Sequence, residues 1–159
     1  MNNEINSYLE WIEELRGQVS QIVAGLPVEA LNWRPVAGTE DHATNSLAVL
    51  AAHVAGAEHH WIAEVVGKQP ATRHRPDEFV TEVTDAAELV TKLTAVHHET
   101  RQIFSQLTAD SLDQTYTIHN HTFTGRWCIL HVIEHTALHL GHMQLTYQLW
   151  QNQPAADSA

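Results

Sequence analysis

The chain has 159 residues, with 8 basic against 19 acidic side chains and a formal net charge of −11. This length is typical of one domain, and the scarcity of Lys and Arg argues against binding to nucleic acids or anionic membranes, which depends on basic side chains. The single cysteine, Cys128, excludes an internal disulfide framework. No apolar run reaches the roughly 18 residues of a membrane span, and the first residues lack a signal-peptide pattern, so we expect a cytoplasmic protein.

Four segments carry the three-and-four spacing of apolar residues that predicts amphipathic helices. Their expected ranges are 5–26, 45–66, 85–107 and 126–150. Pro27 stops the first helix, and Asn45 or Thr44 can cap the second. Asp85 and Glu88 form a capping box that starts the third. Burying four such stripes together predicts an all-α four-helix bundle.

Polar connections separate these helices at 27–44, 67–83 and 108–125. All three are longer than usual for helix connections, and long loops in compact domains tend to be functional. In the third, threonines alternate with larger residues, which is compatible with a short hairpin. We expect the domain to cover residues 1–151 and the tail, 152–159, to be disordered.

Histidine is unusually frequent, with 13 in the chain. Residues 131–142 read HVIEHTALHLGH, which places four of them on one side of the fourth helix. His135 and His139, one turn apart, can point at one ion about 2.0–2.1 Å from each nitrogen. The ends of the run lie about 16 Å apart, so His131 and His142 cannot share that ion. We expect these two to orient the ligands or to line a pocket.

A third ligand must come from another helix. His53 is the best candidate because it borders the apolar stripe of the second helix and is surrounded by alanines and a glycine. His97 is its rival on the third helix, and His60 is a weaker one. Two alternatives stay open: a closed metal site with His97 or His131 as fourth ligand, and a plain bundle whose histidines are hydrogen-bonded core residues.

Acid–base residues are harder to assign. His131, Glu134 and His135 match the H-x-x-E-H signature of inverted zinc proteases, but no glutamate follows Glu134 to complete such a site. Glu134 itself points about 100° away from His135. We do not expect Glu58 or Glu64 to turn inward, so the catalytic residues stay unassigned.

Three stretches resemble the DinB/YfiT-like superfamily of metal-binding four-helix bundles. They are LNWRP at 31–35 with the histidine that follows at 53, the polar loop 109–127, and HVIEHTALHLGHMQ at 131–144. The resemblance implies an up-down-down-up bundle, often dimeric, that holds Zn²⁺ or Ni²⁺ through His53, His135 and His139. Leu140 and His142 stand where the family usually has Arg and Gln.

The resemblance also implies a reaction, since known members include low-molecular-weight-thiol S-transferases. Three neutral imidazoles leave a divalent ion with an open position, where a thiol would lose its proton and water would reach a pKa near 7. Nitrogen ligands favour transition metals over Mg²⁺ or Ca²⁺. We therefore expect a metal-dependent transferase acting on a small molecule with a thiol co-substrate. The alternatives are a metal-dependent hydrolase and a non-catalytic metal-binding module of a stress response.

Overall fold

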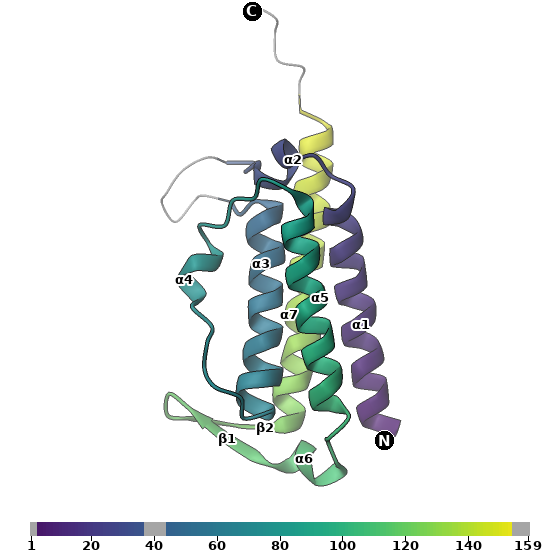
Figure 1. Cartoon of the computed structure of the whole chain (residues 1–159), viewed down its shortest axis with the longest axis vertical. Coiled ribbons are helices and arrows are strands. Elements are labelled where there is room, and N and C mark those ends of the chain that lie inside the picture. Colours follow the sequence, from purple (N-terminus) through teal and green to yellow (C-terminus); the bar gives the residue numbers. More distant parts are fainter. Residues whose placement is uncertain (1–2, 37–43, 154–159) are drawn as a thin grey trace, which may run out of the picture.

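Four long helices form the bundle, and the computed structural model describes residues 3–36 and 44–153. The four helices are α1 (Asn3–Ala24), α3 (Leu47–Glu58) with its continuation η1 (His59–Val66), α5 (Ala86–Phe104) and α7 (Gly125–Gln151). In Figure 1, α1 and α7 run in one direction while α3 and α5 run in the other. The all-α, up-down-down-up bundle expected from the sequence is confirmed.

The helix starts follow local capping chemistry. The Ser46 hydroxyl accepts a hydrogen bond from the backbone N–H of Val49 and so caps α3, which shifts the start by one or two residues from the predicted caps Asn45 and Thr44. The predicted capping box at Asp85 begins α5, where both of its hydrogen bonds are present. The expected tail falls partly on residues 154–159, which lie outside the described part of the chain.

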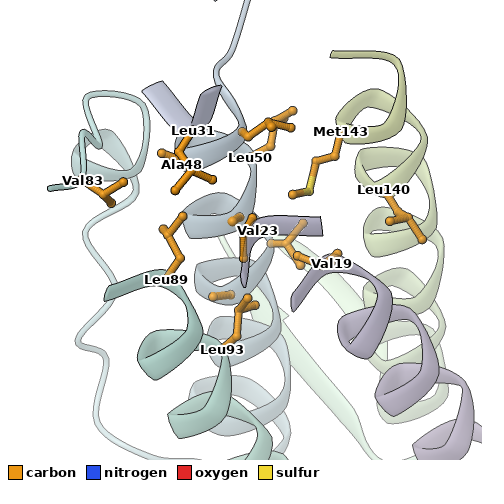
Figure 2. Packing of buried hydrophobic residues seen from close by; sticks show 14 of the residues in the cluster. Val19, Val23, Leu31, Ala48, Leu50, Val83, Leu89, Leu93, Leu140 and Met143 are labelled. Atoms are coloured by element: carbon orange, nitrogen blue, oxygen red, sulfur yellow. The ribbon is translucent and has the colours of Figure 1, made fainter. Parts of the chain in front are cut away.

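Helix α3 is the central helix of the bundle. Eleven of its twelve residues are buried, including His53 and Glu58, and a helix that is apolar on nearly all sides is expected to be surrounded by protein. Residues from α1, α5 and α7 pack around it in an apolar cluster that contains Leu50 and Met143 (Figure 2). The fold therefore carries His53 deep into the interior.

Because α3 with η1 runs parallel to α5, the connection between them must travel the length of the bundle. Residues 67–85 do so beside α3 and contain the short helix α4 (Arg75–Glu78) (Figure 1). Asn32, at the end of α2 (Val28–Asn32), holds the far end of this connection through two hydrogen bonds with the backbone of Val83, at 2.8 and 3.0 Å. The connection thus covers α3 next to the predicted metal ligands.

The expected hairpin is present at the end of the bundle where α7 begins. After α6 (Ala109–Asp113), strand β1 (Thr115–Ile118) pairs antiparallel with β2 (His121–Thr124). Its two turn residues, His119 and Asn120, have φ of 45° and 69°, the left-handed conformation of a two-residue hairpin turn. Among the described helices, none combines the length and apolarity that crossing a membrane requires.

Candidate metal centre

Three histidines from two helices converge between α3 and α7. His53 comes from α3, and His135 and His139 lie one turn apart on α7. One ring nitrogen from each lies within 4.8 Å of the other two, and the Nε2 atoms of His53 and His135 are 3.0 Å apart. These are the three residues that the sequence analysis selected, and the structure brings them together so that they could hold one metal ion.

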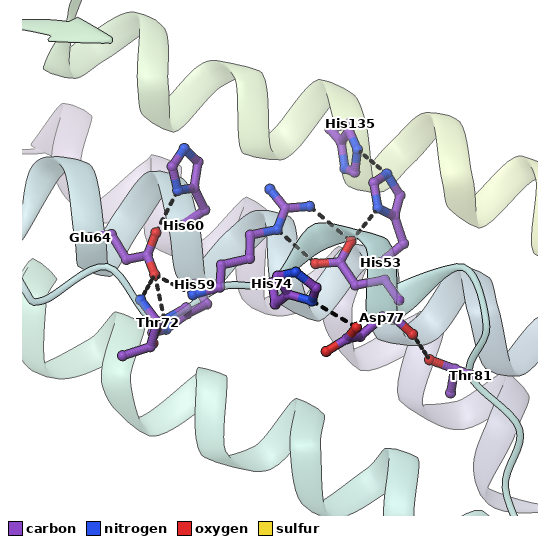
Figure 3. A network of polar contacts seen from close by, with 11 residues as sticks. His53, His59, His60, Glu64, Thr72, His74, Asp77, Thr81 and His135 are labelled. Carbon is purple, nitrogen blue, oxygen red and sulfur yellow. Dashed lines mark hydrogen bonds and ion pairs between the residues drawn. The ribbon is translucent and has the colours of Figure 1, made fainter. Parts of the chain in front are cut away.

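Glu78 fixes the ring of His53 (Figure 3). Its Oε2 lies 2.7 Å from Nδ1 of His53, while Arg73 donates hydrogen bonds of 2.7 and 2.9 Å to its two oxygens. Burial raises the pKa of Glu78, but the hydrogen bonds from Arg73 and His53 outweigh it and lower that pKa. An ionised Glu78 can only accept, so Nδ1 of His53 carries the proton and Nε2 presents a lone pair to the cluster. A carboxylate on the outer nitrogen is typical of metal-bound histidine.

A glycine makes this approach to α3 possible. A Cβ at Gly56 would lie 2.0 Å from Oε1 of Glu78 and 3.3 Å from Nε of Arg73, so any larger residue would displace the carboxylate. The sequence analysis missed both Glu78 and Arg73, which lie in an irregular connection. At Gly141 on α7, by contrast, no atom comes within 4 Å of a Cβ built there.

The protein keeps the three imidazoles neutral. Burial, followed by the neighbouring imidazoles, lowers the pKa of His135 to about 3 and that of His139 to about 4. Burial also lowers the pKa of His53, although Glu78 opposes this effect. Neutral imidazole is the form that binds metals. Bonds of 2.0–2.1 Å in a tetrahedral site place ligand nitrogens about 3.3 Å apart. The Nε2 atoms of His53 and His135 are 3.0 Å apart and all three ligand atoms lie within 4.8 Å of one another, so small side-chain shifts would let these residues hold a divalent transition-metal ion.

The other predicted site histidines lie at different distances from this cluster. Nδ1 of His142 is 3.4 Å from Nδ1 of His139, and the ring centroid of His131 is 5.7 Å from that of His135. His142 and His131 therefore each lie next to one of the candidate ligands. His97 does not join them, because it contacts Arg16 between α5 and α1. The expected roles of these three residues stay predictions.

A cavity of about 420 Å³ opens beside His53 and His135. Its walls come from α3, η1, the 67–85 connection, the hairpin and α7. On the hairpin side the rings of Phe123 and Trp127 stack with centroids 4.2 Å apart, and Trp127 stacks on His131 at 4.8 Å. The candidate metal ligands therefore face a space large enough for a small molecule.

His60 also lines this cavity, and Glu64 fixes its ring (Figure 3). Nδ1 of His60 lies 2.6 Å from Oε2 of Glu64, and Oε1 accepts hydrogen bonds from the backbone N–H groups of Thr72 and Arg73. Burial raises the pKa of Glu64, but these hydrogen bonds lower it to about 2 overall. His60 therefore donates through Nδ1 to Glu64, which fixes the orientation of its ring at the cavity wall.

The expectation that Glu58 and Glu64 stay out of the interior was wrong. The Glu64 side chain is only 5% exposed, and Glu58 is fully buried between α3, α1 and α5, where it accepts hydrogen bonds from Arg16 and Thr100. Burial raises the pKa of Glu58. Cys128 is buried in the core as expected, and burial raises its pKa to about 11.

Comparisons with known proteins agree with this architecture. Residues 12–143 match the DinB superfamily. A solved structure, described as a conserved protein of Enterococcus faecalis, superposes with a TM-score of 0.74 at 17% identity, covering 96% of this chain and 99% of that one; at this identity it is similar in fold alone. No curated protein matches the sequence significantly. The match over most of the chain shows that the protein belongs to the DinB superfamily.

Proposed function

We propose that His53, His135 and His139 bind Zn²⁺ or Ni²⁺ and that the protein is a metal-dependent enzyme acting on a small molecule in the adjoining cavity. The observation that carries this proposal is the convergence of three neutral imidazoles, one of them held by a buried carboxylate, at the wall of a 420 Å³ cavity. Nitrogen-only ligands favour transition metals over Mg²⁺ and Ca²⁺.

The cavity favours an enzyme over a metal-binding module without turnover. Such a module is expected to close the coordination shell with a fourth side chain and to leave no space beside the ion. Here His97 lies with Arg16, away from the cluster, and the cavity reaches the ligands themselves. A substrate can therefore approach the ligands directly.

The reaction that we propose is transfer of a low-molecular-weight thiol to an electrophile. When bound, the ion would lower the pKa of a thiol so that it is a nucleophile at neutral pH. The protein's own residues have two tasks: Glu78 holds His53 in one tautomer, and Glu64 holds the ring of His60 at the cavity wall.

The first test is metal binding. Purified protein should contain about one transition-metal ion per chain, and protein stripped by a chelator should regain Zn²⁺ or Ni²⁺ in a calorimetric titration. His98→Ala is the matched control for the ligand variant His135→Ala. His98 is exposed on α5 away from the cluster, so its loss should leave metal binding unchanged. A wild-type protein without affinity for either ion would overturn the proposal.

The second test is turnover. Metal-loaded protein is mixed with a panel of low-molecular-weight thiols and a chlorodinitrobenzene electrophile, and conjugation is followed by absorbance. Metal-dependent conjugation with at least one thiol supports the transferase. Metal-dependent ester hydrolysis without any thiol would identify a hydrolase and reject the transferase.

A further inference from the structure

We propose that the cavity binds a small molecule with a carboxylate or phosphate group and a flat apolar part. This inference names the substrate class and so rests on the proposed function for its chemical meaning. The charge argument itself concerns only the walls of the cavity.

The walls have the opposite charge character to the protein as a whole. Although the chain carries 19 acidic residues and a net charge of −11, none of the 12 described residues that line the cavity is Asp or Glu. The charged residues of the lining are its two arginines, and its six histidines supply ring nitrogens rather than a fixed charge. A concave surface lined by one sign of charge concentrates ligands of the opposite charge, so this cavity favours anions.

Two arginines from the 67–85 connection have donors to spare. Arg73 uses Nε and Nη2 to hold Glu78, and its Nη1 has no partner among the described residues. The Arg75 guanidinium lies 4.9 Å from the centroid of Phe79, and the described part of the chain offers it no carboxylate partner. Guanidinium groups recognise carboxylate and phosphate through paired hydrogen bonds, so these two are the expected anchors for the anion.

The hairpin turn brings further donors to the same cavity. His119 lines it with φ of 45°, and His121 follows the turn and lines it too. Glycine or asparagine is usual at such left-handed turn positions, and a histidine there is less common. An unusual backbone conformation at the wall of a binding cavity is the kind of strain that occurs at functional sites.

The remaining lining residues indicate the chemical character of the rest of the ligand. Trp61, Phe123 and Ile118 face the cavity, and the Trp61 ring meets that of Phe123 edge-on with centroids 5.4 Å apart. Flat apolar groups pack well on such aromatic surfaces. With about 420 Å³ available, the ligand has the size of a small aromatic or unsaturated acid or phosphate ester.

The test is an NMR titration of metal-free protein, prepared with a chelator and then desalted, that follows the arginine Nε–Hε signals. The probes are benzoate, phenyl phosphate and the uncharged benzamide. We expect benzoate or phenyl phosphate to shift the Arg73 and Arg75 signals, and benzamide to bind at least about tenfold more weakly. Whichever of the two anions binds better distinguishes carboxylate from phosphate recognition.

The variant Arg75→Gln sharpens this test, since Arg75 forms no ion pair with the residues that the structure describes. It should weaken binding of the preferred anion by about tenfold or more. Arg101→Gln is the control, because Arg101 is an exposed arginine paired with Glu13 away from the cavity, and it should leave anion binding unchanged. Equal binding of benzamide and benzoate, or unchanged affinity in Arg75→Gln, would overturn the inference.

The outcome is separable from that of the proposed function. Anion binding is measured without metal, and metal affinity is measured by competition with a chelator dye. Metal affinity without anion preference would reject this inference and keep the metal site. Anion preference without metal affinity would reject the proposed function and keep the anion site.

Discussion

Two polar clusters occupy different faces of α3, and they differ in how their atoms are matched. We call them the arginine cluster (Arg16, Glu58, His97 and Thr100) and the histidine cluster (His53, His135 and His139). In the arginine cluster donors meet acceptors: the Arg16 guanidinium faces the Glu58 carboxylate and Nδ1 of His97, whose pKa is lowered by burial and by Arg16.

In the histidine cluster the groups in contact are all imidazoles, which can hydrogen-bond to one another or bind a cation. Glu78 occupies the donor nitrogen of His53, so a lone pair on His53 faces Nε2 of His135 at 3.0 Å. Nδ1 of His135 is buried without a partner among the described residues, and so is Oε2 of Glu58 in the arginine cluster. What distinguishes the histidine cluster is its set of three neutral imidazole nitrogens within 4.8 Å of one another, a set that can bind a cation and so favours a ligand site. The arginine cluster indicates a structural role.

The largest effect should come from breaking the arginine cluster. Arg16→Ala leaves Glu58 as an uncompensated buried carboxylate, which is expected to lower the free energy of unfolding by about 3–5 kcal/mol. Urea unfolding followed by circular dichroism measures this loss. Arg101→Ala is the control, because its pair with Glu13 is exposed and its loss should change stability little.

If the two clusters are independent, Arg16→Ala should keep the metal affinity of the wild type, measured below the denaturation temperature. A large loss of metal affinity in this variant would show that the arginine cluster also shapes the metal site, and the contrast drawn here would fail.

His135→Ala should instead reduce metal affinity. Structural zinc sites provide about 10–16 kcal/mol over about four ligands, so loss of one ligand is expected to weaken metal binding by about two to three orders of magnitude. The stabilisation that bound metal gives to the folded state should shrink with it. Melting temperatures with and without Zn²⁺ test this, and an equal rise in the variant and the wild type would contradict it.

The two clusters also show what sequence can reveal. His135 and His139 were identifiable because both lie on one helix, where spacing alone determines a shared face. His53 needed one more inference, that small neighbours leave space for an imidazole between helices. The bundle itself followed from four apolar stripes. Each of these signals is local, so no knowledge of the tertiary structure was needed.

What the sequence did not reveal depends on tertiary contacts. Glu78 and Arg73 lie in a connection without periodicity, and nothing local shows that it passes beside Gly56. Glu58 was expected to face outward because we assumed a single apolar stripe on its helix. Since α3 is buried on nearly all sides, even its polar residues need partners in the interior, and Arg16 of α1 supplies one.

Low pH should reveal the contribution of a third carboxylate, Glu64, which holds His60 at the cavity wall. Its pKa is about 2 in the folded protein against an ordinary 4.5, a difference worth about 3 kcal/mol. Because the folded-state pKa is the lower one, this stabilisation is present above pH 4.5 and is lost as the pH falls towards 2. We therefore expect Glu64→Gln to be less stable than the wild type at pH 7, and the stability gap to shrink by more than half at pH 3.

Urea unfolding at both pH values provides the comparison. A stability gap of the same size at pH 7 and pH 3 would show that Glu64 is not held ionised by the hydrogen bonds from His60 and the 67–85 connection.

The smallest effect should come from changing the residues that hold the His53 ring in place, rather than from changing the metal ligands themselves. Gly56→Ala would place a Cβ 2.0 Å from the Glu78 carboxylate and force it away from His53. Loss of such an outer partner typically weakens metal binding about 10–100-fold, so we expect this range for Gly56→Ala and for Glu78→Gln alike. Competition with a chelator dye measures both.

Gly141→Ala is the matched control for the glycine variant. It makes the same change on α7, between His139 and His142, where a Cβ meets no atom within 4 Å. Alanine should there raise stability by up to about 1 kcal/mol through its higher helix propensity and leave metal affinity unchanged. If Gly56→Ala also left metal affinity unchanged while Glu78→Gln reduced it, the carboxylate would reach His53 by another path, and the glycine would not be what admits it to α3.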